Sequence, residues 1–125
     1  VVQRETGILI GVAGFVPALN NYELLADFVP GQAANPAGRS ALELGLYYAI
    51  APAHQRQGYA SEAARALVAY AFDHLRLRRI VATTTHDNAA SQGVMQRLGM
   101  RLLRNTQPEP PWLQVVGVLE NPASG

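Results

Sequence analysis

The chain of 125 residues contains no cysteine and no lysine. Without cysteine there is no disulfide, no thiolate metal site and no cysteine acyl-enzyme, so a transferred group must pass directly to its acceptor or through a residue such as serine. Without lysine there is no Gly-x-x-x-x-Gly-Lys phosphate loop of the kind that nucleotide hydrolases use. All ten basic residues are therefore arginines, and they are scattered along the chain rather than clustered.

Long apolar runs and a strong net charge are missing as well. No apolar run reaches the ~20 residues of a membrane span, and the first residues do not have the pattern of a signal peptide. A net charge of +1 gives no reason to expect a nucleic-acid or membrane partner. We therefore expect a cytoplasmic protein, and its 49% hydrophobic content predicts one domain around one core.

The first half of the chain reads as strands and turns. Two strands, over residues 2–5 and 8–17, flank Thr6-Gly7 and predict a hairpin, because glycine supplies the positive φ that the turn needs. A long excursion rich in Asn, Pro and Gly follows over residues 18–40. Residues 42–51 then form an apolar strand that stops at Pro52.

The second half alternates helices with strands. Apolar residues at steps of three and four predict an amphipathic helix over 60–75, and a β-branched strand follows over 80–85. Asp87 or Asn88 caps a shorter helix that ends near Gly99. The remaining segments, 100–106 and 113–120, read as two final strands. A strand, a crossover helix and another strand imply a parallel pair with a right-handed connection, so the fold class is a mixed α/β sheet.

The turn between the strand over 42–51 and the helix at residue 60 has the features of an anion site. A helix start leaves backbone N–H groups unpaired and carries the positive end of the helix dipole. Gly58 and Ala60 keep bulky side chains away from the backbone there. A phosphate group therefore fits this turn.

Two blocks of sequence carry a resemblance to a known family. Residues 55–60 read Gln-Arg-Gln-Gly-Tyr-Ala and resemble the Gln/Arg-x-x-Gly-x-Gly/Ala signature of the Gcn5-related N-acetyltransferases, whose loop binds the pyrophosphate of coenzyme A. Residues 88–100 begin Asn-Ala-Ala-Ser and end Leu-Gly-Met. They are similar to the Asn-x-x-Ser…Leu-Gly-Phe/Met helix of the branch that acetylates ribosomal-protein N-termini. The order and spacing of the two blocks also fit.

The resemblance implies the acyl-CoA N-acyltransferase fold, in which two central parallel strands, here 42–51 and 79–85, splay apart to admit coenzyme A. It also implies that this single domain, residues 1–125, lacks the usual first strand and two helices, which build one wall of the acceptor site. We therefore expect a truncated domain that associates as a homodimer. The cofactor-binding residues implied are Tyr48, Ala49, Ile50, Gln55, Arg56, Gln57, Gly58, Tyr59, Ala60, Ser61 and Asn88.

Acetyl transfer to an amine requires a base that accepts the amine proton and a donor that stabilises the departing sulfur. An amine with a pKa of ~8–10 is mostly protonated at neutral pH, so a base or a water chain must take its proton. The resemblance places Glu43 where the family often has its base; otherwise Glu43 is an ordinary strand residue. It also implies that Ser91 donates to the coenzyme A sulfur; otherwise Ser91 makes only a local backbone bond.

Other positions leave alternatives open. Asn88 either touches the pantetheine amide, caps the helix, or does both. Many relatives have a tyrosine as the thiolate acid where this chain has Met95, so Ser91, a water, Tyr47 or Tyr48 must take that role. Arg56 stands where many members have glycine, and it either contacts a phosphate or remains solvated.

Three further patterns point away from other chemistries. His54, His74 and His86 do not share a metal-ligand spacing, so no metal is expected. Ser91 has His86 and Asp87 nearby but lacks the Gly-x-Ser-x-Gly elbow of hydrolases, which favours local capping. Trp112 follows a proline-rich stretch and reads as a packing anchor; an exposed Trp112 would instead indicate an oligomer contact.

We therefore expect an N-acetyltransferase that moves acetyl from acetyl-coenzyme A directly to a primary amine, on a protein N-terminus or on a small molecule. The alternative is a non-catalytic coenzyme A-binding or protein-interaction module.

Overall fold

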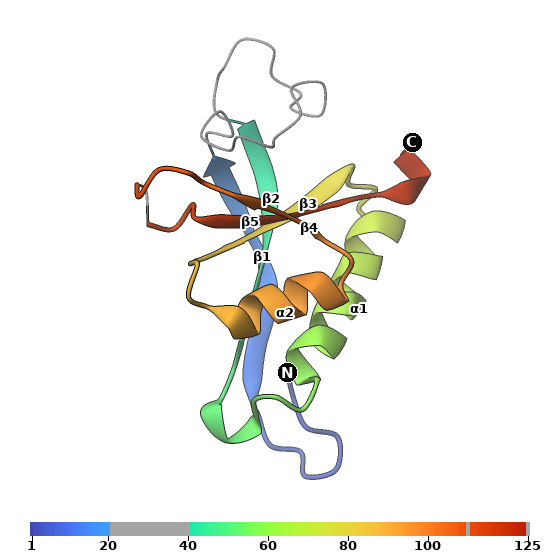
Figure 1. Ribbon diagram of the computed structural model, residues 1–125. Helices are drawn as coiled ribbons and strands as arrows, with labels where there is room; N and C mark the ends of the chain where they lie inside the picture. The colour runs from blue at the N-terminus through green and yellow to red at the C-terminus, as the bar shows by residue number, and fades with distance from the viewer. Residues whose placement is uncertain (21–40, 110, 125) are drawn as a thin grey trace.

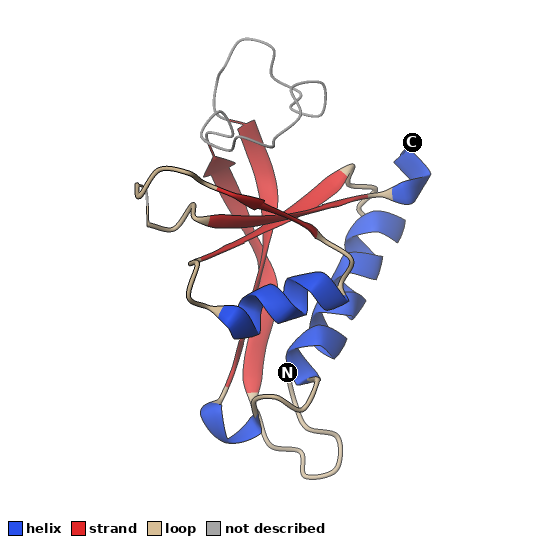
Figure 2. Cartoon of the chain, viewed as in Figure 1, coloured by secondary structure: helices blue, strands red, loops and turns tan. Residues whose placement is uncertain are grey.

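The computed structural model describes residues 1–20, 41–109 and 111–124, and these form a five-stranded mixed sheet with two α-helices (Figures 1 and 2). The mixed α/β class predicted from the sequence is confirmed. The strands are β1 (Gly11–Asn20), β2 (Ala41–Ile50), β3 (Arg79–Thr84), β4 (Arg101–Arg104) and β5 (Val115–Glu120). The helices are α1 (Tyr59–Asp73) and α2 (Ala89–Arg97), with short 3-10 turns η2 (Pro52–His54) and η3 (Pro122–Ser124).

The strands lie in the order β1-β2-β3-β5-β4. The pair β2 and β3 is parallel, as the crossover through α1 predicts, and the other neighbours are antiparallel. β1 begins and ends three residues later than the strand predicted over 8–17, since its register with β2 runs from Gly11 opposite Ile50 to Asn20 opposite Ala41. Pro17 is tolerated within β1 because β1 is an edge strand. The rest of the predicted excursion, residues 21–40, lies outside the described residues.

The predicted strand over residues 2–5 is wrong. Only one bridge, Val2 opposite Leu9, joins the described residues of this hairpin. The backbone of Gln3 is used to close the turn, since its N–H donates to Ile8 O (2.9 Å) and its carbonyl accepts from Gly7 N (2.8 Å). The turn glycine is as predicted, with φ +72° at Gly7.

Both helices pack on the same face of the sheet. Leu46 of β2 with Ile80 and Ala82 of β3 forms one core cluster that includes side chains of α1 and α2: Ala64, Ala71, Phe72 and Met95. Figure 1 shows α2 lying across the sheet, with α1 beside it. Gly117 of β5 makes room for this packing, since a Cβ there would lie 2.8 Å from Met100 Sδ and 3.1 Å from Met95 Sδ.

Trp112 is 65% exposed, so its prediction as a packing anchor is wrong. The loop between β4 and β5 is held by two buried amides instead. Asn105 Nδ2 donates to Glu109 O (3.2 Å), and Gln114 Nε2 donates to the carbonyls of Gln107 and Pro108 (both 3.2 Å). These bonds shape the loop, and the apolar residue that is buried in it is Leu113 rather than Trp112. β4 ends two residues earlier than predicted, and β5 begins two residues later.

Helix α2 ends as predicted, with Gly99 in the left-handed conformation (φ +84°). Gly93, inside the same helix, has open space around its Cβ position. Gly99→Ala should lower the free energy of unfolding by roughly 1–2 kcal/mol, since a Cβ is disfavoured at that φ. Gly93→Ala should raise it by about 0.5–1 kcal/mol through helix propensity. Urea denaturation of the two variants checks this, and changes of the same sign would contradict the assigned helix end.

Candidate active site

A cleft opens where β2 and β3 part. Among the described residues their parallel register is a single pair, Gly45 opposite Val81, whereas β1 and β2 stay paired along ten residues. The cleft has a volume of about 960 Å³ and is lined by the end of β2, the turn after it, and the first turns of α1 and α2. The N-termini of both helices therefore meet at one opening.

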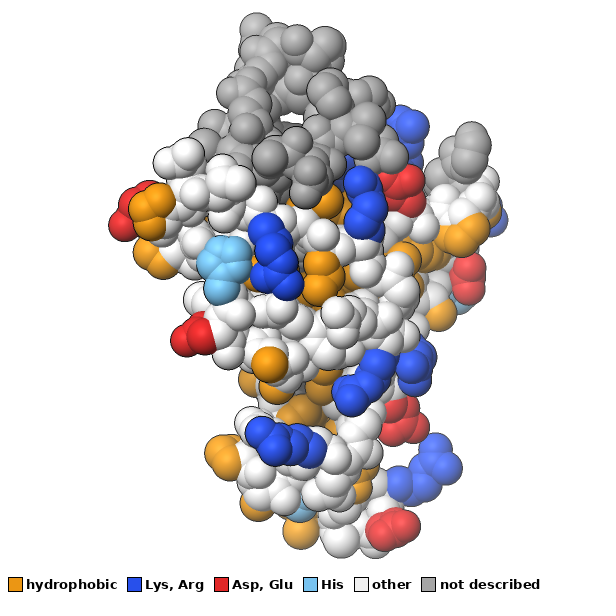
Figure 3. All heavy atoms as spheres, viewed as in Figure 1, with side chains coloured by type: hydrophobic (Ala, Val, Ile, Leu, Met, Phe, Trp, Pro, Cys, Tyr) orange, Lys and Arg blue, Asp and Glu red, His pale blue; other side chains and the backbone are white. Residues whose placement is uncertain are grey.

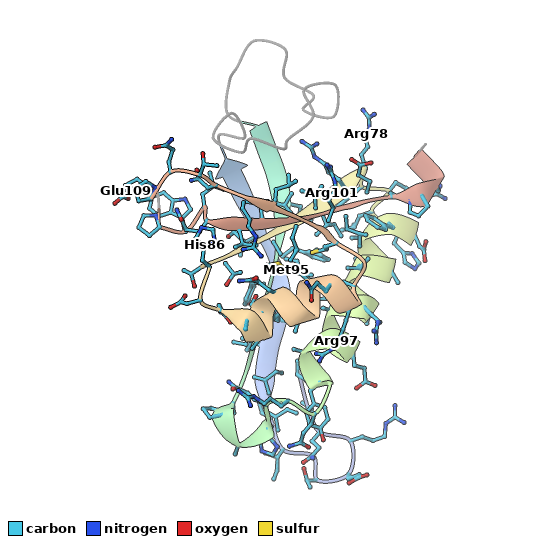
Figure 4. The ribbon with its side chains drawn as sticks, viewed as in Figure 1. Arg78, His86, Met95, Arg97, Arg101 and Glu109 are labelled. Carbon is cyan, nitrogen blue, oxygen red and sulfur yellow. The ribbon has the colours of Figure 1, made fainter. Side chains whose placement is uncertain are left out.

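All eleven residues predicted to bind cofactor line this cleft, from Tyr48–Ile50 through the turn 55–61 to Asn88. The sequence reasoning missed the cleft-facing side of α2, which is formed by Ala90, Gly93, Val94 and Arg97. Their spacing of three and four residues was the available signal. Figure 4 labels Arg97 and Met95, which come from opposite sides of the helix: Arg97 lines the cleft, and Met95 lies in the core.

The turn before α1 leaves its backbone donors free. Gly58 caps the helix in the left-handed conformation (φ +85°), and its carbonyl accepts from Glu62 N (3.0 Å). Within the described part of the chain, none of the N–H groups of residues 56–61 donates a hydrogen bond. The turn is nevertheless fixed, since Gln55 Nε2 donates to Ile50 O (2.9 Å) and Tyr59 Oη accepts from Gln3 Nε2 (2.9 Å).

Ser61 adds an unsatisfied polar atom to the same helix start. Its side chain is 3% exposed, and its Oγ has no hydrogen-bond partner among the described residues. Buried hydroxyls nearly always have a partner, so an unpaired one at a residue of the cleft wall suits a polar ligand.

A second, smaller cleft of about 260 Å³ lies on the other side of the divergence. It is lined by Val16 of β1, residues 45–48 of β2 and residues 81–84 of β3. Three side chains, those of Tyr48, Asn88 and Ser91, line both clefts. The two clefts therefore adjoin at these three residues.

The three shared residues are bonded to one another. Tyr48 Oη lies 2.9 Å from Ser91 Oγ and donates to the Ser91 carbonyl at 3.1 Å. Asn88 Oδ1 accepts from Ser91 N (3.0 Å), which confirms the predicted helix cap. The contact with Tyr48 shows that the Ser91 side chain does more than bond its local backbone.

Burial raises the pKa of the Tyr48 phenol above its ordinary value, and the hydrogen bond with Ser91 offsets only part of that rise. The phenol is therefore neutral at physiological pH and has a proton to donate. Met95, at the position where the resemblance to the family implies a tyrosine, is fully buried in the core. Of the residues predicted to replace that tyrosine, Tyr47 lines only the smaller cleft, whereas Tyr48 and Ser91 lie at the boundary between the two.

The backbone of Glu43 lies in β2, opposite Ala18 of β1. Its side chain is outside the described residues, so its role as a base stays a prediction.

The serine, histidine and aspartate near the start of α2 do not form a triad. Ser91 Oγ meets Tyr48, and His86 Nδ1 lies 3.4 Å from Arg104 Nη1. Asp87 accepts from the Thr85 hydroxyl, which is the main reason that the pKa of this carboxyl is lowered. The side-chain cap of α2 is Asn88 rather than Asp87. In the described ranges we find no group of three or more candidate ligands for a metal, and no helix there is long and apolar enough to cross a membrane.

Residues 1–101 match the family model described as "Acetyltransferase (GNAT) domain". The match covers most of the chain, and the chain therefore belongs to the GNAT acetyltransferase family, as its resemblance to the Gcn5-related N-acetyltransferases implies.

Individual relatives agree with this family. The chain is 31% identical over 96 residues to the uncharacterized N-acetyltransferase YjdG of Bacillus subtilis, covering 77% of this chain and 55% of that protein. An acetyltransferase structure from Agrobacterium tumefaciens matches with a TM-score of 0.65 and 26% identity, over 93% of this chain and 56% of that one. A Vibrio cholerae structure, provisionally described as a ribosomal-protein-serine acetyltransferase, matches with a TM-score of 0.62 and 26% identity, over 95% and 60%. The chain thus spans little more than half the length of these relatives.

The raised pKa of Tyr48 predicts a measurable titration. Because the folded-state pKa lies above the ~10 of an unfolded tyrosine, the stability contribution of this phenol is complete below pH ~10 and is lost as the pH rises through the folded value. The ultraviolet tyrosinate signal of the parent, minus that of Tyr48→Phe, should therefore have its midpoint above pH ~10. Tyr70→Phe, which removes an exposed phenol, is the control. A midpoint at or below the ordinary value would contradict the burial of Tyr48.

Proposed function

We propose that this chain binds acetyl-coenzyme A in the larger cleft and transfers the acetyl group directly to a primary amine that enters the smaller one. The observation that carries the proposal is the early parting of β2 and β3, which brings two helix N-termini and free backbone donors to one opening beside Tyr48, Asn88 and Ser91.

The charge of the larger cleft suits a polyphosphate ligand. Arg56 and Arg97 line it, together with the free N–H groups of residues 56–61 and the helix dipole behind them. No Asp or Glu is among the described residues that line it. We propose that the pyrophosphate of coenzyme A lies on residues 56–61, that Ser61 Oγ serves as a further partner, and that Arg56 contacts a phosphate. On the face of the molecule that Figure 3 shows, the arginines are scattered and do not form a continuous basic stripe.

The end of β2 suits the pantetheine arm. Among the described residues, β2 has no register pair with β3 beyond Gly45, and residues 48–50 of β2 line the cleft. Backbone N–H and C=O groups at such an edge need hydrogen-bond partners. The two amides of pantetheine can be those partners, in the place that a neighbouring strand would otherwise take. Asn88 Oδ1 accepts a hydrogen bond from Ser91 N, so the Nδ2 group of Asn88 is available to donate to a pantetheine carbonyl.

The residues at the boundary favour direct transfer over an acyl-serine. A neutral phenol beside Ser91 cannot take the serine proton, so it does not activate Ser91 as a nucleophile. In the proposed step the amine nitrogen attacks the thioester carbon, the C–S bond breaks, and the nitrogen gives its proton to a base, for which we propose Glu43. The sulfur leaves as a thiolate that accepts a hydrogen bond from Ser91.

The acceptor is either a protein N-terminus or a small amine. The likeness to the Vibrio cholerae structure, provisionally described as a ribosomal-protein-serine acetyltransferase, supports testing an N-terminal serine peptide first. We also propose a cytoplasmic homodimer. The support for self-association is that Val12, Val16 and Tyr47 share one face of the β1–β2 pair and are all more than 40% exposed, as is Trp112.

Gly58→Val should weaken coenzyme A binding at least about tenfold, because a side chain at the left-handed helix cap disturbs the N–H groups that we assign to the pyrophosphate. Gly7→Val is the matched control, since Gly7 has a similar φ (+72°) and equally open surroundings but does not line the cleft. Calorimetric titration of both folded variants measures the effect. Parent-like affinity in Gly58→Val would show that the phosphate site lies elsewhere.

Glu43→Gln should lower turnover more at neutral pH than at high pH, where the amine has already lost its proton. Release of free thiol from acetyl-coenzyme A in the presence of an amine panel measures this. A parent-like rate for the variant at every pH would remove Glu43 from the mechanism. Tight coenzyme A binding by the parent, without thiol release for any amine, would instead favour the non-catalytic module.

A further inference from the structure

The phenol of Tyr48 has one proton and two acceptors, and both acceptors belong to Ser91. The Ser91 carbonyl lies 3.1 Å from Tyr48 Oη, and Ser91 Oγ lies 2.9 Å from it. A tyrosine hydroxyl donates one hydrogen bond at a time, so these two contacts describe two possible positions of the phenol proton.

The two positions have different consequences for Ser91. When Tyr48 donates to the carbonyl, Ser91 Oγ–H donates back to Tyr48 Oη, and its proton is occupied. When Tyr48 donates to Ser91 Oγ, the serine proton is free to point into the clefts. The change between them needs only the rotation of two O–H bonds.

We propose that Tyr48 is the positioning residue for Ser91: its O–H turns from the Ser91 carbonyl to Ser91 Oγ and so directs the serine proton at the departing coenzyme A sulfur. This inference rests on the proposed function and adds the residue that orients its thiolate donor. No covalent bond of Tyr48 or Ser91 breaks. The broken bond is C–S of the thioester, the new bond is C–N, and the amine proton leaves through the base.

The surroundings of both residues hold the pair in place. Tyr48 is opposite Ala13 in the β1–β2 ladder, and its ring packs against the core cluster under α1 and α2. Ser91 is fixed from its backbone, since its N–H donates to the Asn88 cap at 3.0 Å. With both backbones held, the hydroxyl protons are the parts that are free to turn.

The acid strengths indicate that Tyr48 keeps its proton. A thiol has a pKa of ~8.5 and a phenol ~10, and burial raises the pKa of this phenol further. Transfer of the phenol proton to a thiolate is therefore uphill, whereas donation of a hydrogen bond through Ser91 is not. This distinguishes Tyr48 from a general acid that protonates the leaving group.

The first test is a double-mutant cycle on thiol release. Tyr48→Phe keeps the ring and removes the hydroxyl, and it should lower kcat by about 10–100-fold with KM for acetyl-coenzyme A little changed. Ser91→Ala should lose a similar amount, and adding Tyr48→Phe to it should cause no further loss, because Tyr48 acts through Ser91. Tyr70→Phe, the same change on an exposed face of α1, is the control. Multiplicative losses in the double variant, or a parent-like Tyr48→Phe, would overturn the proposal.

The second test does not depend on turnover. The parent should bind coenzyme A about tenfold more tightly than desulfo-coenzyme A, and the preference should grow with pH as the thiol ionises, since a positioned hydroxyl stabilises the thiolate. Tyr48→Phe should abolish this pH-dependent preference while its affinity for desulfo-coenzyme A stays unchanged. A preference that survives in Tyr48→Phe, or that is absent in the parent, would contradict the proposal. A Tyr48-dependent preference in a parent that acetylates no amine would refute the proposed reaction and leave the positioning role standing.

Discussion

The early parting of β2 and β3 is the constraint from which the site follows. After Gly45 and Val81 the two strands no longer share a register, so the sheet cannot close over its own backbone there. The helices that follow each strand begin beside the gap, and their N-termini supply the donors and the positive potential that a closed sheet would lack. We propose that the opening left by this divergence is the binding site.

Side chains bridge the gap where the backbone does not. Tyr48 from β2 reaches Ser91 of α2 across the opening, and the two clefts meet at this contact. Below it, the core cluster of Leu46, Ile80, Ala82 and Met95 holds both strands to both helices. The core therefore holds the two strands and the two helices together, and the Tyr48–Ser91 pair lies where the two clefts meet.

Local signals in the sequence were enough to predict the main elements and many of the residues that line the larger cleft. The glycine turn before α1, the Asn88 cap and Gly99 each act within a few residues, and all are where the sequence places them. The error at β1 concerns a partner that is distant in sequence, since β1 begins and ends three residues later than predicted where it pairs with β2 from Gly11 to Asn20. The error at Trp112 is local: Trp112 is exposed, and Asn105 and Gln114 hold its loop through residues four to seven positions away. The Tyr48–Ser91 contact joins residues 43 positions apart, so no local pattern could show it.

The central claim is that the diverging strands hold acetyl-coenzyme A with its phosphates on the turn before α1 and its thioester beside Ser91. Backbone amide NMR during a coenzyme A titration tests it most directly. The account predicts the largest shifts at residues 56–61 and at residues 88–91, with the far end of α1 and strand β4 nearly unchanged. Shifts concentrated on β4 or the end of α1, with none in the turn, would contradict it.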